Sequence, residues 1–251
     1  MDFLFDLPQP ELNKKIRLIT FFSGIGSQEM AMRDIGVDFE IYKAVEFDKY
    51  AIASYNAIHG TNFPTIDICN FHGTDLNIIE KDKYNYVLTY SFPCQALSVA
   101  GKMEGMKEGS GTTSSLLWEV YRILQECKDL ADKNPKYGLP DILVMENVSQ
   151  VHSEQNMPEF QKWLDFLKSL GYFSYYEDLN AEDFGIPQHR ERCFGVSILS
   201  KEFIEFEFPK KIPLQYVMKD FLQEKVDDKY FIRNEKADKL IEQLKKDGKL
   251  D

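Results

Sequence analysis

One of the four cysteines, Cys94, stands between a proline and a glutamine at the end of a predicted strand. It lies in "SFPCQALSVAG", directly after the apolar run "YNYVLTY", which is typical of a buried strand. A thiol there could pack in the core, bind a metal, form half of a disulfide or act as a nucleophile. Pro93 fixes its own φ and removes a backbone donor, so it stiffens the loop that would aim the thiol. Taken alone, the pattern favours an inert buried cysteine, the commoner fate of a lone Cys.

Two later stretches carry charged groups that could work with such a thiol. The segment "ILVMENVSQ" ends a predicted strand at Glu146 and Asn147, which puts a carboxyl group on the rim where the cysteine lies. Among apolar neighbours that carboxyl would have a raised pKa and could donate a proton. In "GIPQHRERCF", an extended chain would place Gln188, Arg190 and Arg192 on one face. Two guanidinium groups suit a phosphate or a carbonyl oxygen, although a solvated charge run is the simpler reading of this stretch alone.

A glycine turn near the N-terminus indicates a ligand site. In "FFSGIGSQEMAM", Gly24 and Gly26 lie between a predicted strand and a helix, where the backbone turns tightly. Glu46 follows about twenty residues later, where an acid can accept hydrogen bonds from both ribose hydroxyls. Asp67, in "TIDI", could accept from an adenine amino group. Each acid alone is more simply a cap or a surface residue, but together they outline an adenosine-shaped slot. Without a Lys-Ser or Lys-Thr pair after the glycines, a triphosphate cradle is not indicated.

The elements that must position these residues alternate between strand and helix. The runs "IRLITFF", "FEIYKAVEF", "YNYVLTYSF" and "DILVMENV" predict strands, with a short strand at "TIDI", and "SSLLWEVYRILQECKDL" and "MPEFQKWLDFLKSLGY" predict helices. Residues 172–179 and 192–199 predict two more strands, arranged as an antiparallel hairpin. We therefore expect an α/β fold with a mostly parallel sheet, helices on both faces, and ligands at the carboxyl ends of the strands.

Composition limits the other classes. The chain has 251 residues, 43% of them hydrophobic, and its beginning carries acids where a secretion signal would carry bases, so we expect a cytoplasmic protein with no membrane span. Its four cysteines and four histidines show neither a disulfide framework nor metal-ligand spacing, so we expect no metal. A formal charge of -11 argues against gripping nucleic acid over the whole surface, although a local basic cleft is compatible with it.

Four motifs in order identify a family. The stretches "FFSGIGSQEMA", "SFPCQALSVAGKMEG", "MENV" and "GIPQHRER" resemble the F-x-G-x-G, P-C-Q, E-N-V and Q-x-R-x-R motifs of the DNA cytosine carbon-5 methyltransferases, over roughly Ile16 to Ser197. The resemblance implies a Rossmann-like S-adenosylmethionine-dependent methyltransferase fold. It also implies duplex DNA as substrate, with one cytosine flipped out so that carbon 6 can be reached. A cognate restriction endonuclease is a possible accompanying partner.

The resemblance assigns roles at the reacting base. Cys94 would add to carbon 6 of the cytosine, Glu146 would hydrogen-bond ring nitrogen 3 and the exocyclic amine, and Arg192 would bind the carbonyl oxygen at position 2. Arg190 would support the loop or a phosphate. The remaining residues expected to contact the substrate are Phe92, Gln95, Asn147 and Gln188.

The resemblance likewise assigns the S-adenosyl-L-methionine site. Glu46 would bind the ribose, and Asp67 would lie at the adenine edge. The residues expected to line the cofactor pocket are Phe22, Gly24, Ile25, Gly26, Phe47, Ile68, Pro93 and Leu116. Ser27 and Ser91 stand where the family often has glycine, and Thr113 stands where some relatives carry an arginine.

Beyond the fourth motif the sequence departs from the family. After about Pro213, "LQYVMKDFLQEKVDD" and "NEKADKLIEQLKKDGKLD" are charged and helical in pattern, so we divide the chain into a catalytic domain, 1–212, and a helical appendage, 213–251. Two late family motifs, R-x-x-x-x-x-E and Q-x-G-N, are absent, so we expect an apolar flank, an incomplete cofactor pocket and a second polypeptide that supplies target recognition, as in a split or truncated enzyme.

Three other functions are compatible with parts of the pattern. An RNA cytosine methyltransferase acting on tRNA would share the thiol, glutamate and arginine motifs. A non-catalytic subunit would keep only the cofactor slot. A dinucleotide oxidoreductase would use the same glycine turn with NAD.

Overall fold

A computed structural model of the protein describes residues 14–95, 97, 105–232 and 234–248. Most of the acidic N-terminal stretch and residues 98–104 of the motif around Cys94 lie outside these ranges. The strands are Lys15–Phe21 (β1), Phe39–Val45 (β2), Tyr84–Tyr90 (β3), Ile142–Asn147 (β4), Tyr172–Asn180 (β5) and Glu191–Leu199 (β6). The helices are Ser27–Asp34 (α1), Lys49–His59 (α2), Gly73–Leu76 (α3), Leu117–Lys133 (α4), Met157–Ser169 (α5) and Glu235–Lys246 (α6).

The six strands form one mixed sheet in the order β2-β1-β3-β4-β6-β5. Strands β2, β1, β3 and β4 run parallel to one another, and β6 runs antiparallel to both β4 and β5. The predicted hairpin is thus confirmed, as is the mostly parallel sheet. Because β1, β3 and β4 all end at one edge, the loops that follow them meet there.

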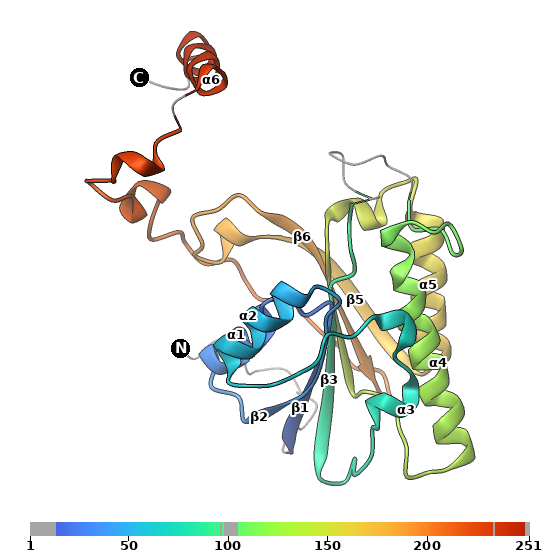
Figure 1. The fold of residues 1–251 in the computed structure, drawn as a ribbon. Helices are drawn as coiled ribbons and strands as arrows, with labels where there is room; N and C mark the ends of the chain where they lie inside the picture. The colour runs from blue at the N-terminus through green and yellow to red at the C-terminus, as the bar shows by residue number, and fades with distance from the viewer. Residues whose placement is uncertain (1–13, 96, 98–104, 233, 249–251) are drawn as a thin grey trace.

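Helices cover both faces of the sheet, as predicted (Figure 1). On one face α4 and α5 bury their apolar stripes, including Ile123 and Trp163, against strand residues such as Leu88. On the other face Met32 of α1 packs near Leu18, and α2 packs through smaller clusters at the β2 side. Among the described helices, none combines the length and apolar character needed to cross a bilayer.

The two faces are unequally buried at β4 and β6. Residues of these strands that point toward α4 and α5 are fully buried, such as Leu143 at 0% exposed and Met145 at 2%. Their neighbours on the opposite face, including Val144, Phe194 and Val196, are only half-buried. Parallel strands are normally covered on both sides. This part of the sheet therefore has an apolar flank that the described residues cover incompletely.

The predicted strand at "TIDI" is wrong. Residues 61–67 form no regular element, and a 3₁₀ turn, Ile68–Asn70, follows them. One backbone bond, from the Ile66 N–H to the Glu46 carbonyl at 2.8 Å, keeps the segment beside the end of β2. Asp67 then accepts from the Cys69 N–H at 3.0 Å and begins the turn. Side-chain capping by Asp67 therefore replaces strand pairing at this point.

After β6 ends at Leu199, the Ile212 N–H still donates to the Asp183 carbonyl at 2.8 Å. The C-terminal segment that carries α6 then extends away from the sheet (Figure 1). The helix predicted at 214–228 is wrong, because this segment has only 3₁₀ turns at Met218–Phe221 and Asp228–Tyr230. Its apolar side chains are exposed, Phe221 by 65% for example, so nothing stabilises a helix by burial. The helix predicted further on is confirmed as α6. The division into 1–212 and 213–251 stays a prediction.

Candidate active site

Hydrogen bonds hold the loop that carries Cys94 at the backbone carbonyls of the two residues before it, Phe92 and Pro93. Tyr90 at the end of β3 pairs with Met145 of β4, so the loop starts beside the end of β4. Asn147 Nδ2 donates to the Phe92 carbonyl at 3.0 Å. The Ser114 hydroxyl donates to the Pro93 carbonyl at 2.7 Å. Cys94 itself is a half-buried free thiol, and its two predecessors hold it at the carboxyl edge of the sheet.

Three charged groups meet at the end of β4. Arg192 Nε lies 3.2 Å from Glu146 Oε1, and Arg190 Nη2 lies 3.9 Å from the same oxygen. The side chains of Glu146 and Arg192 are 27% and 25% exposed, so solvent reaches both. The nearest partners of Glu146 are guanidinium groups, whereas the sequence predicted apolar neighbours. A carboxylate and two guanidiniums at one strand end can bind a polar ring by complementary donors and acceptors.

The predicted alternation of Gln188, Arg190 and Arg192 along one extended face is only partly correct. Strand β6 begins at Glu191, and the Gln188 N–H bonds to the Ile186 carbonyl at 2.7 Å in a tight turn. Arg190 already lies beside the end of β5, because its N–H donates to Asn180 Oδ1 at 2.9 Å. The turn centred on Pro187 thus directs Gln188, which is exposed, away from the extended segment of the two arginines.

Of the residues expected to contact substrate, Phe92 and Asn147 are buried, at 2% and 3% exposed. Asn147 also accepts the Val148 N–H at 2.9 Å, so its amide is used at both ends. The Asn147 amide thus holds the Cys94 loop through the Phe92 carbonyl, and the predicted substrate contacts of these two residues stay predictions. Gln95 is exposed directly after the thiol.

The glycine turn is tight, as its sequence predicted. Phe22, Gly24 and Gly26 have φ values of 57°, 55° and 84°, so every second residue is left-handed. The Glu46 carboxylate accepts the Gly24 N–H at 2.9 Å and the Asp48 N–H at 2.8 Å. Glu46 thereby joins the turn to the end of β2 and keeps further lone pairs for a ligand hydroxyl.

The structure also reveals a support of this turn that the sequence analysis missed. His59 Nε2 of α2 lies 2.9 Å from the Ile25 carbonyl, and Arg33 Nη2 lies 3.0 Å from its Nδ1. A Cβ added at Gly26 would stand 2.1 Å from His59 Nε2. The imidazole therefore occupies the space that a side chain at Gly26 would need. A histidine at the end of the second helix was the available signal, but nothing in the spacing linked it to the turn.

The residues expected to surround an adenosine differ in how far they are exposed. Phe47 and Ile25 are exposed by 72% and 51%, although both are large and apolar. Ile68 is buried, and Asp67 begins the turn before it. Leu116 packs against the core at the start of α4. Exposed apolar side chains, a carboxylate and open space within 4 Å of a Gly24 Cβ fit a nucleoside with a flexible amino-acid tail.

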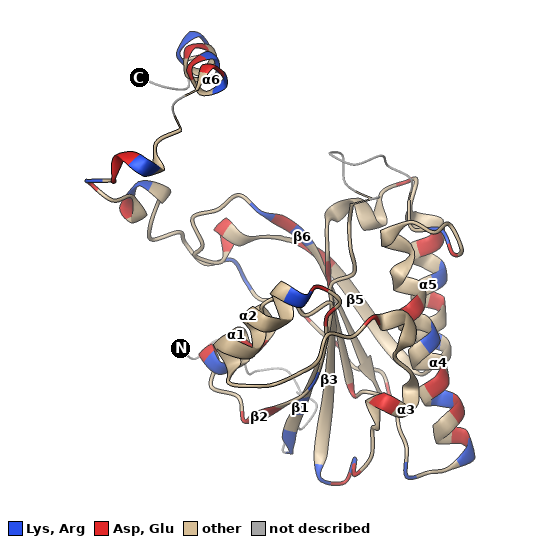
Figure 2. Cartoon of the chain, viewed as in Figure 1, with Lys and Arg blue, Asp and Glu red and all other residues tan. Residues whose placement is uncertain are grey.

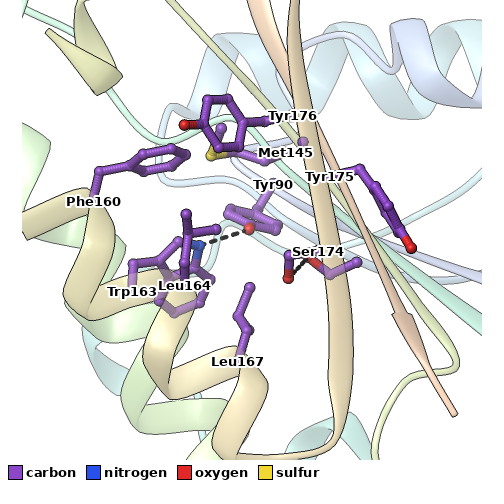
Figure 3. Close-up of a pocket in the computed structure, with 11 residues that line it drawn as sticks. Tyr90, Met145, Phe160, Trp163, Leu164, Leu167, Ser174, Tyr175 and Tyr176 are labelled. Atoms are coloured by element: carbon purple, nitrogen blue, oxygen red, sulfur yellow. Dashed lines mark hydrogen bonds between the residues drawn. The ribbon is translucent and has the colours of Figure 1, made fainter. Parts of the chain in front are cut away.

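Two hollows lie away from this edge. The cavity in Figure 3, between α5 and the sheet, has a volume of about 10 Å³ and is lined by Tyr90 and Trp163, which share a hydrogen bond of 3.1 Å. It has room for about one water molecule, so it is a packing defect. A groove of about 670 Å³ follows the edge of β2 beside Phe63 and Phe71. Neither contains the residues grouped around Cys94.

One group of metal-ligand types occurs in the described chain. His152, Asp178 and Cys193 bring their donor atoms within 4.8 Å of one another. His152 Nε2 is 3.0 Å from both Asp178 oxygens, so these two form an ion pair when the imidazole is protonated. Burial raises the pKa of the Cys193 thiol to about 12, which leaves it protonated at neutral pH. His152 and Asp178 therefore form an ion pair next to a buried, protonated thiol. The expectation that the protein binds no metal stays a prediction.

Comparison with known proteins decides the family. The profile of the C-5 cytosine-specific DNA methylases matches residues 16–249. The chain belongs to this family. Among curated relatives, the methylase is 34% identical to the type II methyltransferase M2.ScrFI of Lactococcus lactis subsp. cremoris, over 87% of this chain and 71% of that protein. It is 33% identical to the orphan methyltransferase M.SssI of Spiroplasma monobiae, over 88% and 68%.

Solved structures support the fold of this methylase. S. pombe Dnmt2 methyltransferase aligns with a TM-score of 0.63 at 20% identity, over 94% of this chain and 66% of that one. Entamoeba histolytica EhMeth aligns with a TM-score of 0.67 at 18% identity, over 92% and 66%. The chain thus spans about two thirds of the length of the proteins that it matches.

Proposed function

We propose that this methylase binds S-adenosyl-L-methionine and methylates carbon 5 of a cytosine extruded from duplex DNA, with Cys94 as nucleophile. The observation that carries the proposal is the convergence of Glu146, Arg192 and Arg190 at the end of β4, beside the fastened loop that presents the thiol. Membership of the family supports the reaction class. Extrusion is required because carbon 6 is inaccessible inside a base stack.

Each residue answers one demand of the chemistry. The Cys94 thiolate forms a bond to carbon 6, and the electron pair displaced from the ring makes carbon 5 nucleophilic. Glu146 hydrogen-bonds nitrogen 3 and the amine, which stabilises the charge that develops there, and Arg192 donates to the carbonyl oxygen at position 2. When the base binds, the ion pair between Glu146 and Arg192 is replaced by the contacts of each residue with the base. After methylation, loss of the carbon 5 proton returns the electron pair, and the thiolate leaves.

The cofactor supplies a methyl group on a positively charged sulfur. The turn at Gly24 and Gly26 would receive its amino-acid portion, and Glu46 the ribose hydroxyls. Phe47 would pack on the adenine, with Asp67 at its amino edge. No side chain caps α1, so the start of that helix is suited to a carboxylate.

We further propose that a recognition region outside residues 16–249 completes the enzyme, on the same or a second polypeptide. The half-buried face at β4 and β6 and the exposed apolar side chains after Ile212 support this. Acidic and basic residues alternate along α4 and α6 (Figure 2), and the net charge of -11 offers little general attraction for DNA.

Transfer of labelled methyl groups tests the proposal. The wild type should label cytosine in duplex DNA slowly and without strong site preference, whereas Cys94→Ala should abolish labelling and Glu146→Gln should lower it by at least about a hundredfold. Labelling of tRNA but not of duplex DNA would assign the RNA reaction instead. Strong site-specific methylation by the purified chain alone would contradict the need for a completing region.

A further inference from the structure

We propose that Arg122, on α4, is the positioning residue for the adenine end of the cofactor site. The proposal rests on the proposed function, because it takes the turn of Asp67 and Ile68 to be the adenine edge. Arg122 is too far along α4 to belong to any of the four sequence motifs. Its guanidinium, however, reaches across to that turn.

Arg122 holds two carbonyls of the segment at once. Its Nη2 donates to the Ile68 carbonyl at 3.1 Å and to the Phe71 carbonyl at 2.9 Å. These two carbonyls lie at the start and the end of the turn that Asp67 begins. Since 61–67 has no strand pairing of its own, the guanidinium supplies contacts that the missing strand would otherwise provide.

The other donors of Arg122 bind carboxylates of its own helix, and its Nη1 also lies 3.2 Å from His72 Nδ1. Nε donates to Glu119 Oε2 at 2.8 Å, and Nη1 donates to Glu126 Oε1 at 2.7 Å. Glu126 in turn accepts the Gly73 N–H at 2.7 Å, so a second contact from α4 reaches the same segment. Two carboxylates thus orient a planar fork toward two carbonyls, which an arginine can do and a lysine cannot.

This arrangement joins two walls of the slot. Leu116, predicted to line the adenine pocket, directly precedes α4, and the turn of Asp67 and Ile68 lies against the same helix through Arg122. The distance between the walls therefore depends on this guanidinium. Because Arg122 makes no contact with the residues at the reacting base, it should influence cofactor affinity and leave the chemical step unchanged.

Calorimetric binding of S-adenosylhomocysteine tests the role. Arg122→Met should raise Kd about tenfold, with an intermediate effect for Arg122→Lys, which keeps the charge but cannot reach both carbonyls. Lys128→Met is the matched control, because Lys128 lies on the same helix and, among the described residues, pairs with the exposed Asp132 alone, at 2.6 Å. This control should bind like the wild type. In methylation assays, Arg122→Lys should raise KM for the cofactor and leave kcat within about twofold.

A double-mutant cycle identifies the route of the effect. Asp67→Asn combined with Arg122→Lys should weaken binding by less than the product of the two single effects, because both act through one turn. Wild-type affinity in Arg122→Lys, or fully independent effects in the cycle, would overturn the positioning role. If the wild type itself does not bind S-adenosylhomocysteine, the proposed function fails, which is a separate result. Should Arg122→Met not fold, the lysine variant decides.

Discussion

At the scale of single residues, the active-site edge depends on atoms that never touch a substrate. Gly26 is the clearest case, because its φ is 84° and a Cβ there would stand 2.1 Å from His59 Nε2. A left-handed φ alone costs an alanine about 1 kcal/mol. The close imidazole adds a steric penalty to that conformational one.

Gly26→Ala should therefore lower the free energy of unfolding by more than about 2 kcal/mol and weaken cofactor binding, since His59 must shift away from the Ile25 carbonyl. Gly36→Ala is the matched control: Gly36 has a φ of 73° but nothing within 4 Å of its Cβ position. Urea denaturation should show a loss of only about 1 kcal/mol in the control. Equal losses in both variants would show that the imidazole does not matter.

At the scale of elements, loops at the carboxyl ends of strands are held by side chains from neighbouring elements. The Ser114 hydroxyl, just before α4, fastens the Pro93 carbonyl at 2.7 Å, and Asn147 of β4 fastens that of Phe92. Two segments that come later in the chain thus determine the position of Cys94. Such contacts position a nucleophile without changing its own chemistry.

Ser114→Ala should slow reaction of Cys94 with cytosine by about tenfold while lowering the free energy of unfolding by only about 1 kcal/mol. Its neighbour offers a control, because the Ser115 hydroxyl donates to the Thr112 carbonyl within the same turn, at 2.7 Å. Single-turnover kinetics of Ser115→Ala should match the wild type. An unchanged rate in Ser114→Ala would show that the Ser114 hydroxyl does not position Cys94.

The contact between α3 and α4 gives a pH dependence. Burial opposes ionisation of Glu126, but hydrogen bonds from Gly73, Arg122 and His72 outweigh it, so the pKa of Glu126 lies below its usual range. A lowered pKa in the folded state stabilises the fold at neutral pH, and this contribution is lost as pH falls from about 4.3 downward. Glu126→Gln should therefore flatten the acid limb of a stability profile measured by urea denaturation at a series of pH values.

At the scale of the whole molecule, the chain divides into a packed sheet and an exposed C-terminal stretch. After Ile212 the large apolar side chains are exposed, including Met218 at 64% and Ile232 at 75%. They contribute little burial to the stability of the sheet. Exposed apolar groups in such number mark a surface meant to be covered.

A chain shortened to end at Ile212 should therefore unfold within about 2 °C of the full chain, because few contacts are lost. Differential scanning calorimetry makes the comparison. A drop of more than about 5 °C would show that residues 213–251 belong to the folding unit of the sheet, and would contradict the proposed division.

Periodicity and motif order were sufficient for most of the fold. The runs ending at Phe21 and Tyr90 are strands because their apolar residues are buried on both faces, and the run ending at Asn147 is buried mainly on the face of α4 and α5. The strand at "TIDI" could not be judged from sequence, since an Asp67 cap competes with pairing there. The helix at 214–228 failed because helical periodicity needs a surface to bury against. The supports His59, Ser114 and Arg122 were missed because they act across distant parts of the chain.

The most direct test of the account is covalent trapping of Cys94. The protein is incubated with S-adenosylmethionine and with duplex or single-stranded DNA in which every cytosine is replaced by 5-fluorocytosine. Because every cytosine is substituted, the test does not depend on the target sequence. The fluorine on carbon 5 blocks the final elimination, so the covalent adduct persists. We predict a denaturation-resistant adduct whose peptide mass locates the base on Cys94, and its absence in Cys94→Ser. An adduct that persists in Cys94→Ser, or none with the wild type on either DNA, would contradict the claim that this thiol attacks the base.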